Sequence, residues 1–386
     1  MNKIKNYDLL IIGGGISGCV FLSNYLKNNT NDKIALIEAG RSLGGRSSTR
    51  FSNRYKGFQL NHGSPNLNII NNKKNYKLEE FIKNLLKNNI IQFDDSDFIN
   101  LSIENKVKII NNSVFSRGTN YTSTSSMSDL SKRIIEINNL NSQVDFYFNT
   151  LIVKLEFNKK WIVISQNGEI FQTKFLVCSS NLLLHKRSMK IFKTNQIPLR
   201  QCIPENKDKK FDLLFKILNS QSFIKRISFL IYTKPNYQFL DSYSKRYRYF
   251  YLNKDLENNY KFERVLFNLQ KNNNLGIVIQ TKNKELIDSS NIEKTENKLQ
   301  KDVLINFNNL FKDSPFINQL TDYQGFSIMR WRASQPLGKG VPNSLQICQK
   351  YKIGFCGDWF DEEGFGRVEG AILSGLELAN KFNLLN

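Results

Sequence analysis

Residues 7–38 constrain the fold of this chain more tightly than any other segment. A short apolar run, residues 7–12, leads into Gly13-Gly14-Gly15-Ile16-Ser17-Gly18, which fits the pattern G-x-G-x-x-G. Residues 19–26 carry apolar side chains at helical spacing, and a second apolar run, residues 33–37, ends at Glu38. A glycine-rich turn between a buried strand and a helix, followed by an acidic residue at this distance, is typical of dinucleotide-binding βαβ units.

The glycines and the acidic residue each have a physical role in holding a nucleotide. Gly13 allows the sharp turn from strand to helix, Gly15 lets a diphosphate approach the backbone, and Gly18 lets the helix pack closely on the strand. The N-terminus of the following helix offers unpaired N–H groups and partial positive charge to the phosphates. Glu38 can accept hydrogen bonds from ribose hydroxyls, and its charge disfavours a 2′-phosphate. The segment therefore predicts a bound dinucleotide.

The residues after Glu38 indicate which dinucleotide this is. Glu38-Ala39-Gly40-Arg41-Ser42-Leu43-Gly44-Gly45-Arg46 resembles the E-(A/K)-x-x-x-x-G-G-R extension of glutathione-reductase-like and amine-oxidase-like flavoproteins. The resemblance implies that Gly44 and Gly45 let the backbone approach FAD, and that Arg46 offers a forked cation to its diphosphate. Rossmann domains that bind only NAD usually lack this extension. The sequence therefore favours FAD.

The segment Leu60-Asn61-His62-Gly63-Ser64-Pro65 resembles the D-x-G-A segment of the same flavoproteins. The chain departs from the family at Asn61, where a carboxylate is usual, so no role for a charge is expected there. Gly63 still allows a close approach of the backbone to the flavin ring. His62 is a candidate acid–base group, but we favour a structural or supporting role because the family does not use this position for chemistry.

A second motif lies near the C-terminus. Residues 351–355 form a short, mostly apolar run before Cys356-Gly357-Asp358-Trp359, and residues 366–375 read G-R-V-E-G-A-I-L-S-G. This order resembles the C-terminal motif of FAD-dependent amine-oxidase-like proteins. The resemblance implies that Asp358 accepts hydrogen bonds from the ribityl hydroxyls. It also implies that a helix beginning near Val368 points its positive end at the flavin pyrimidine, where a reduced flavin carries negative charge.

Together these motifs imply an FAD that is held by both ends of the chain. Covalent attachment, as in mitochondrial amine oxidases, uses a cysteine in a local sequence that neither Cys348 nor Cys356 matches, so non-covalent binding is expected. The predicted cofactor-binding residues are Gly13, Gly15, Ile16, Ser17, Gly18, Glu38, Ala39, Gly44, Gly45, Arg46, Gly63, Ser64, Val153, Gly357, Asp358, Val368, Glu369, Gly370 and Ala371. Val153 is carried over from the strand that contacts the adenine in the related fold.

Three local features resemble a bacterial renalase-like subgroup of these flavoproteins. They are G-D-W-F followed by G-R-V-E-G-A, the segment Met329-Arg330-Trp331-Arg332-Ala333-Ser334-Gln335-Pro336, and Gly118 with residues 127–131. The catalytic residues cannot be named from the sequence, because the flavin itself carries the chemistry. Trp331 and Arg332, with His62, are the substrate-side candidates, and a core position for Trp331 is an equal alternative.

The fold class expected is α/β, with a Rossmann-like FAD-binding domain of the glutathione-reductase type and a second α+β substrate domain on a mixed or antiparallel sheet. The FAD-binding domain is expected to comprise residues 1–75, 120–185 and 340–386, and the substrate domain residues 76–119 and 186–339. Asn167-Gly168 predicts a hairpin between residues 161–165 and 170–172, and residues 175–179 are expected to return to the parallel sheet. Helices are predicted at residues 76–89, 127–138 and 295–310, and further strands at residues 144–149, 150–157, 211–218, 227–232, 247–252 and 275–280.

Composition limits the remaining function classes. The net charge of +21 comes from 55 Lys and Arg against 34 Asp and Glu. The basic residues are spread along the chain, so we interpret the charge as compositional and expect no nucleic-acid partner. Five cysteines without a C-x-x-C pair and only two histidines argue against a disulfide framework and a metal site. No apolar run approaches the length of a transmembrane helix and no signal peptide is recognised, so a soluble, cytoplasmic protein is expected.

The resemblance implies an FAD-dependent oxidoreductase that takes a hydride from a small nitrogen-containing substrate and passes the electrons to O2 or another acceptor. The renalase-like alternative implies a dihydronicotinamide-type substrate, that is, a nicotinamide nucleotide. The amine-oxidase alternative implies a small amine held between aromatic side chains. A flavin-binding protein without catalysis is a third alternative, and hydride chemistry on polyenes is a fourth, which the absence of an apolar membrane-docking segment weakens.

Overall fold

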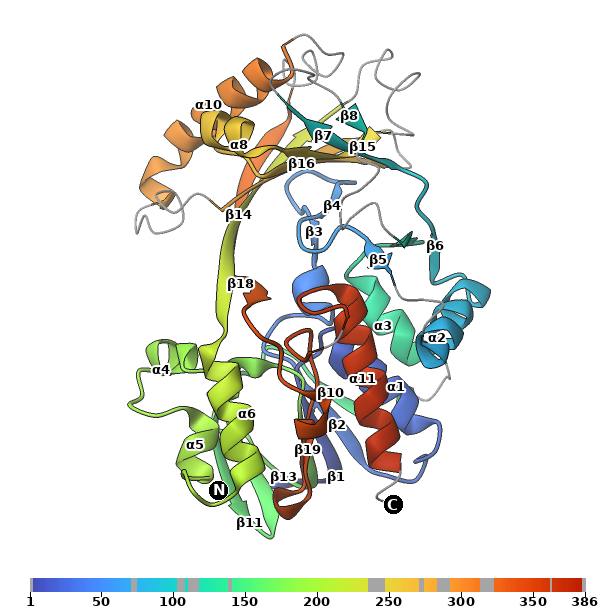
Figure 1. Cartoon of the computed structure of the whole chain (residues 1–386), viewed down its shortest axis with the longest axis vertical. Coiled ribbons are helices and arrows are strands. Elements are labelled where there is room, and N and C mark those ends of the chain that lie inside the picture. Colours follow the sequence, from blue (N-terminus) through green and yellow to red (C-terminus); the bar gives the residue numbers. More distant parts are fainter. Residues whose placement is uncertain are drawn as a thin grey trace.

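The computed structural model describes residues 3–70, 75–102, 108–109, 118–137, 141–234, 247–270, 274–282, 292–312, 323–361 and 363–383. These residues form two lobes, each built on one large β-sheet (Figure 1). Both ends of the chain lie in the lower lobe in that view, and the long strand β14 runs from the lower lobe into the upper one. The domain boundaries expected from the sequence stay a prediction.

The lower lobe contains an eight-stranded sheet in the order β10-β2-β1-β13-β12-β11, with β20 paired to β13 and β19 paired to β20. The central strands are parallel, as the βαβ pattern predicts. All four residues of β2 are buried, as expected for a parallel strand covered on both faces. The strands are β1 (Lys5–Ile12), β2 (Ile34–Ile37), β10 (Val144–Tyr147), β11 (Ile152–Asn158), β12 (Lys160–Ser165), β13 (Ile170–Cys178), β19 (Ile347–Cys348) and β20 (Ile353–Phe355).

The hairpin predicted at Asn167-Gly168 is confirmed. β12 pairs with β13 in antiparallel register, Trp161 opposite Thr173, and Gly168 adopts a left-handed φ of +80°. Residues 170–172, predicted as a hairpin strand, and residues 175–178, predicted as part of the parallel sheet, belong to one continuous strand, β13. β13 pairs with β12 along its first residues and with β1 along nearly its whole length.

The helices α1 (Ile16–Leu26) and α11 (Val368–Asn383) lie side by side against the lower sheet (Figure 1). Gly375 makes this approach close, because a Cβ there would lie 2.6 Å from the carbonyl oxygen of Ser17. The predicted helices at 76–89 and 127–138 are confirmed as α2 (Tyr76–Lys87) and α3 (Asp129–Glu136), although residue 138 lies outside the described part. Their buried faces belong to the same core as α1 and α11. A small sheet, β5 (Leu67–Ile69), β9 (Thr119–Ser123) and β6 (Ile91–Phe93), adjoins them.

One predicted element is wrong. Residues 211–218 were expected as a strand, but they belong to the helix α6 (Lys209–Ser220). The buried residues Phe211, Leu214, Phe215 and Leu218 follow the helical spacing, and Asp208 caps the helix by accepting a hydrogen bond from the backbone N–H of Phe211 at 2.9 Å. With α4 (Arg187–Phe192) and α5 (Pro198–Cys202), this helix packs in the lower lobe.

The upper lobe contains a seven-stranded sheet in the order β18-β14-β17-β16-β15-β7-β8. All neighbours are antiparallel except β15 and β7, so the sheet is mixed, as expected. The predicted strands at 227–232, 247–252 and 275–280 are confirmed, and β16 was not predicted. The strands are β7 (Asp97–Leu101), β8 (Lys108–Ile109), β14 (Ser222–Thr233), β15 (Tyr247–Leu252), β16 (Arg264–Leu269), β17 (Leu275–Thr281) and β18 (Gly325–Leu337).

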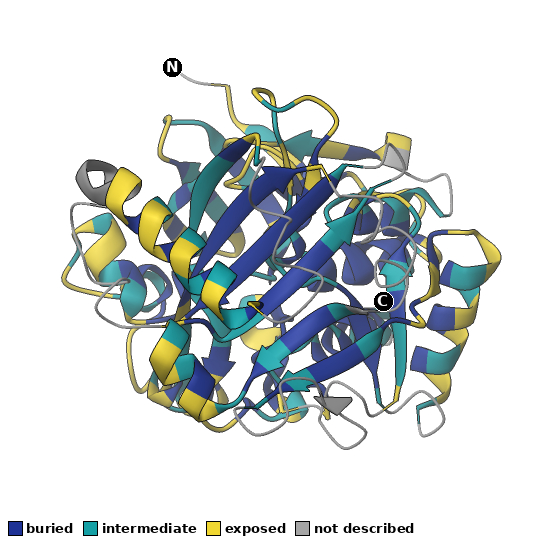
Figure 2. Ribbon diagram, turned by 90° about the horizontal axis from the view of Figure 1, so that it is seen from above, coloured by how far each residue is buried: buried dark blue, intermediate teal, exposed yellow. Residues whose placement is uncertain are grey.

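The outer face of this sheet is covered by α10 (Ile292–Leu310), which confirms the helix predicted at 295–310, and by α8 (Lys254–Tyr260). Leu299, Val303 and Phe307 of α10 share a core with the strands, and Figure 2 shows the buried strands beneath the partly exposed helix. The inner face of the sheet looks toward the lower lobe (Figure 1).

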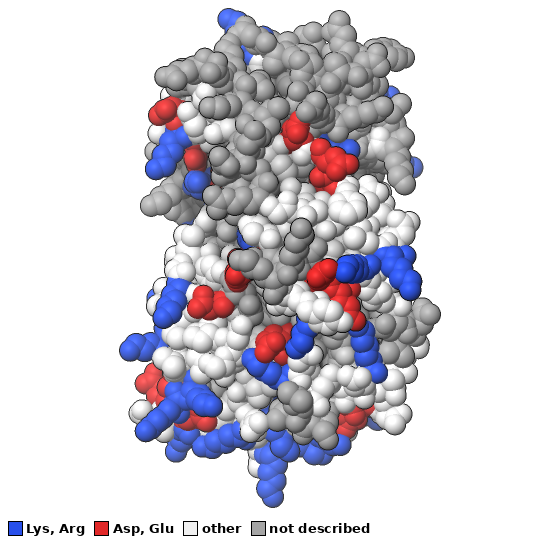
Figure 3. Space-filling model, turned by 45° about the vertical axis from the view of Figure 1, so that its right-hand side comes forward, with Lys and Arg blue, Asp and Glu red and all other residues white. Residues whose placement is uncertain are grey.

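Shorter elements complete the described chain. They are the strand pair β3 (Thr49–Phe51) and β4 (Gln59–Asn61) and the 3-10 helices η1 (Gly45–Ser47), η2 (Asn141–Gln143), η3 (Asn181–Leu183), η5 (Asn343–Leu345) and η6 (Gln349–Tyr351). Within the described ranges, none of the helices has both the length and the apolar composition needed to cross a bilayer. On the face shown in Figure 3, acidic side chains lie among the basic ones, and basic side chains gather at the lower end.

Candidate functional site

A cavity of about 680 Å³ lies where the inner face of the upper sheet meets the lower lobe. This volume falls within the range of pockets that bind small molecules and cofactors. From the two sequence motifs and the segment at 60–65, its wall includes Gly13, Gly15, Ile16, Ser17, Glu38, Gly44, Gly45, Arg46, His62, Gly63, Ser64, Asp358, Val368 and Ala371. Segments from both ends of the chain therefore meet at one site.

The N-terminal glycine turn has the geometry that its sequence predicts. Gly13 adopts a φ of +112°, which residues other than glycine rarely adopt. Its carbonyl oxygen accepts a hydrogen bond from Oγ of Ser179 at 2.9 Å. A Cβ at Gly18 would clash with this carbonyl oxygen, so the helix can pack here only with glycine. The N-cap residue of α1 is Gly15, which has no side chain to cap the first turn, and Gly15, Ile16 and Ser17 line the cavity.

Glu38 stands at the end of β2 with both carboxylate oxygens held by backbone groups. Oε2 accepts a hydrogen bond from the N–H of Gly14 at 2.7 Å, and Oε1 accepts one from the N–H of Gly40 at 2.6 Å. A carboxylate oxygen can accept more than one hydrogen bond. The side chain is therefore fixed at the cavity wall with acceptor capacity left for a ligand.

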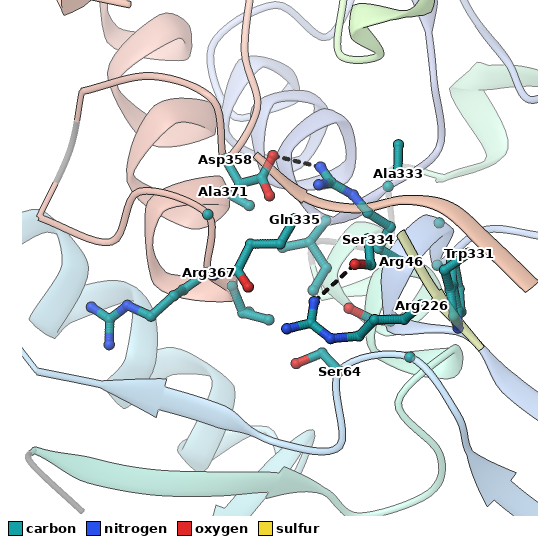
Figure 4. A pocket seen from close by; sticks show the side chains of 18 of the residues that line it. Arg46, Ser64, Arg226, Trp331, Ala333, Ser334, Gln335, Asp358, Arg367 and Ala371 are labelled. Atoms are coloured by element: carbon teal, nitrogen blue, oxygen red, sulfur yellow. Dashed lines mark hydrogen bonds and ion pairs between the residues drawn. The ribbon is translucent and has the colours of Figure 1, made fainter. Parts of the chain in front are cut away.

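The extension after Glu38 folds back onto the glycine turn. Gly44 and Gly45 both have positive φ, at +119° and +53°, and a Cβ at Gly45 would lie 3.2 Å from Cα of Gly15. The next residue, Arg46, forms an ion pair with Asp358, whose Oδ1 lies 2.5 Å from its Nη2 (Figure 4). This pair joins the N-terminal and C-terminal motifs directly.

His62 lies on the cavity wall, and its exposed fraction is only 3%. Its carbonyl oxygen accepts hydrogen bonds from three side chains of the upper sheet: Gln280 at 2.8 Å, and Ser228 and Trp331 at 3.2 Å each. The rings of His62 and Trp331 are 5.1 Å apart. Burial, and to a smaller extent the charge of Arg50, lower the pKa of His62 to about 4, so its imidazole is neutral near pH 7.

Comparison with known proteins identifies one matching domain family and solved structures with a similar fold. Residues 11–85 match the family of NAD(P)-binding Rossmann-like domains, and no curated protein sequence matches the chain. Among solved structures, a putrescine oxidase bound to putrescine has a TM-score of 0.64 at 11% identity, covering 99% of this chain and 100% of that chain. A provisionally assigned protoporphyrinogen oxidase from Exiguobacterium sp. 255-15 has a TM-score of 0.67 at 12% identity, covering 100% of both chains.

The chain has the fold of these oxidases. The fold class expected from the sequence is thereby confirmed, as is the resemblance to amine-oxidase-like flavoproteins at the level of the fold. We refer to it below as the amine-oxidase-like fold.

Within the amine-oxidase-like fold, six predicted cofactor residues are not among those that line the cavity. The residues outside the wall are Gly18, Ala39, Val153, Gly357, Glu369 and Gly370. Glu369 is fully buried, where Oε1 accepts a hydrogen bond from the N–H of Ile70 at 2.9 Å and Oε2 pairs with Arg367. These contacts tie the start of α11 to the lower lobe, and any contact of these six residues with FAD stays a prediction.

Two of the substrate-side candidates, Trp331 and Arg332, are neighbours on β18 and point to opposite faces of the sheet. Trp331 lines the cavity, whereas Arg332 is exposed and lies outside the wall, because neighbouring residues of a strand point to opposite faces. Trp331 is half-buried and donates its ring N–H to the His62 carbonyl oxygen, so it also holds the His62 segment in place.

Sequence reasoning missed the cavity residues contributed by the middle of the chain, which are chiefly Arg187, Phe223, Arg226, Tyr251, Glu263, Arg264, Gln280, Ser334 and Gln335. Arg226 is the clearest case. It is 8% exposed, its Nε and Nη2 lie 2.7 and 2.9 Å from the two oxygens of Glu263, and its Nη1 donates to Oγ of Ser334 at 2.8 Å (Figure 4). A single arginine inside the apolar strand 222–233 was the signal that could have identified it.

Glu263 is ionised at this site. Burial opposes the loss of its proton, but the hydrogen bonds and charge of Arg226, together with the charges of Arg264 and Lys282, lower the pKa of Glu263 to about 2. Both charges are therefore present together, and the pair forms a fixed polar patch on the inner face of the upper sheet.

Proposed function

We propose that the chain is an FAD-dependent oxidoreductase in which the cofactor spans the cavity between the two motifs. The observation that carries this proposal is the meeting of Glu38, Arg46 and Asp358 around one cavity with the uncapped start of α1. A nucleotide cofactor needs ribose acceptors, a cation and N–H groups for its diphosphate, and this set supplies them.

The residues present fit FAD in this place. Glu38 would hold the ribose, Arg46 and the first turn of α1 the diphosphate, and Asp358 the ribityl chain. When bound, FAD would accept a hydride from the substrate. None of the described residues that line the cavity is a cysteine, which supports non-covalent binding. The neutral His62 would limit the access of water to the flavin side without carrying a charge.

For the substrate we propose a dihydronicotinamide-type nucleotide, as in the renalase-like alternative. Arg264 lines the cavity beside Tyr251 and Trp331, next to the paired Arg226 and Glu263. Cationic groups beside aromatic surfaces suit a ligand that carries phosphates and a planar ring.

A small amine is the second candidate substrate. One of the matched structures is a putrescine oxidase bound to putrescine, and the aromatic side chains of Phe223, Tyr251 and Trp331 line the cavity here. Glu263 is the one acidic side chain that the upper sheet contributes to the wall among the described residues, and it is already paired with Arg226. An amine would therefore depend on aromatic contacts.

The test is anaerobic reduction of the purified flavoprotein. Its flavin spectrum is recorded first, and 2- or 6-dihydro-NAD(P) and simple amines are then added separately. Rapid bleaching by the dihydronicotinamides alone supports the first substrate. Bleaching by amines alone eliminates it in favour of the second, and a protein that bleaches with neither is a flavin-binding protein without this catalysis.

A further inference from the structure

Arg187, at the start of α4, lies on the cavity wall outside both sequence motifs. Its Nη2 donates a hydrogen bond to Oδ1 of Asn181 at 2.7 Å, and its guanidinium carbon lies 5.0 Å from the centre of the Phe223 ring. Its Nε is buried and has no hydrogen-bond partner. Among the residues that the structure describes, no carboxylate forms an ion pair with this side chain.

The other arginines of the cavity differ from Arg187 in this respect. Arg46 pairs with Asp358, Arg226 with Glu263, and Arg367 with Glu369. Arg264 donates to Oε1 of Gln280 at 2.5 Å and lies in the field of Glu263. Arg187 instead contacts a neutral amide and an aromatic ring, and the like charge of Arg46 lowers its pKa.

This arrangement is costly without a ligand. A guanidinium group removed from water needs a counter-charge to offset its lost hydration. Burial, with a further contribution from Arg46, lowers the pKa of Arg187 to about 10, which still leaves it charged near pH 7. An anionic group in the cavity would supply the counter-charge that this guanidinium lacks and would lie between the two like charges.

The position of Arg187 brings it to the dinucleotide turn. Asn181 follows Ser179 and Ser180, and these two serines lie against Gly13, since Oγ of Ser179 donates to the Gly13 carbonyl oxygen and a Cβ at Gly13 would lie 3.1 Å from N of Ser180. Phe223, on the other side of the guanidinium, belongs to β14 of the upper sheet. Arg187 therefore lies at the junction of the two lobes, within the same cavity as Arg46.

We propose that Arg187 binds a phosphate group of a ligand seated in this cavity. The proposal rests on the proposed function, because that function supplies two sources of such a group: the diphosphate of the flavin cofactor and the phosphate of a nucleotide substrate. Guanidinium and phosphate form paired, charge-assisted hydrogen bonds, which suits a forked donor held from one side by Asn181.

The direct test uses inorganic pyrophosphate as the probe on flavin-free protein. We expect Arg187→Met to bind pyrophosphate at least about tenfold more weakly than the unaltered protein, and Arg187→Lys to keep part of the affinity. Arg200→Met is the matched control, because Arg200 also lies over aromatic rings, those of Phe211 and Phe215, but outside the cavity wall. Arg187→Gln replaces the methionine variant if melting curves show that the latter is unfolded.

Two further measurements distinguish the sources of the phosphate. A weakened FAD dissociation constant in Arg187→Met assigns the cofactor diphosphate. An unchanged FAD constant, with a raised KM for a dihydronicotinamide nucleotide and an unchanged KM for the phosphate-free riboside, assigns the substrate. Equal binding of pyrophosphate by Arg187→Met and the unaltered protein, or no binding by either, overturns the proposal. If the protein neither retains FAD nor oxidises any substrate, the proposed function fails, while the pyrophosphate titration still decides the role of Arg187.

Discussion

At the scale of single residues, the glycines and Glu38 could be predicted because each satisfies a local requirement. Gly13 needs its φ of +112°, and Glu38 needs only to stand at the end of β2. Arg187 and Glu263 could not be predicted as site residues, because their place depends on how distant strands and helices come together. A short motif specifies a local backbone shape, whereas a cavity wall is a property of the tertiary fold.

Replacing Glu38 by Ala should weaken FAD binding by at least about tenfold. The change removes the ribose acceptor and also releases the N–H groups of Gly14 and Gly40, and hydrogen bonds to charged groups contribute about 1.5–3 kcal/mol each. Fluorescence titration of flavin-free protein measures the dissociation constant. Glu38→Gln, which keeps the shape and one acceptor, should lose less, and full FAD affinity in Glu38→Ala would contradict the ribose assignment.

His62 should make stability depend on pH in a defined window. Its pKa is about 4 in the folded protein and about 6.5 when unfolded, so between these values the unfolded chain binds more protons and stability falls as the pH falls. The contribution is constant above pH 6.5 and amounts to a loss of up to about 2 kcal/mol at pH 5.

Urea unfolding at pH 7.5 and pH 5 checks this expectation. His62→Gln removes the titrating group, so the difference between the two pH values should be smaller in this variant than in the unaltered protein. His185 is present in both proteins, so its contribution to the pH dependence of stability cancels in the comparison. Equal pH dependence in the two proteins would show that the imidazole of His62 is not held in a buried, neutral form.

At the scale of elements, strongly patterned segments were predictable and ambiguous ones were not. The hairpin at Asn167-Gly168 and the helix α2 have clear turn and spacing signals. Residues 211–218 form a dense apolar run that fits either period, and only the cap at Asp208 distinguishes a helix from a strand. β16 was missed because Arg264 and Asn268 interrupt its short apolar run.

Replacing Asp208 by Ala should therefore destabilise the lower lobe by about 1 kcal/mol through loss of the N-cap of α6. Asp208→Asn keeps an oxygen that can accept from the N–H of Phe211 and serves as the control. Chemical denaturation measures both variants. If Asp208→Ala and Asp208→Asn are equally stable, the hydrogen bond to Phe211 does not cap the helix.

At the scale of the whole molecule, the site belongs to neither lobe alone. The His62 segment comes from the N-terminal part of the chain, yet Gln280, Ser228 and Trp331 of the upper sheet donate to its carbonyl oxygen. Arg46 and Asp358 similarly join residues far apart in the sequence. A ligand in this cavity touches both lobes, so its binding free energy should stabilise both.

FAD should therefore slow amide hydrogen exchange on both sides of the cavity. A ligand that binds only the folded state at 100 times its dissociation constant stabilises that state by about 2.7 kcal/mol. We expect slower exchange in residues 34–46 of the lower lobe and in β17 of the upper lobe, which carries Gln280 to the cavity. The exposed face of α10, on the far side of the upper sheet, should change least and is the internal control. Protection limited to the lower lobe would mean that the cofactor binds the Rossmann-like half alone, and that the upper sheet meets only the substrate.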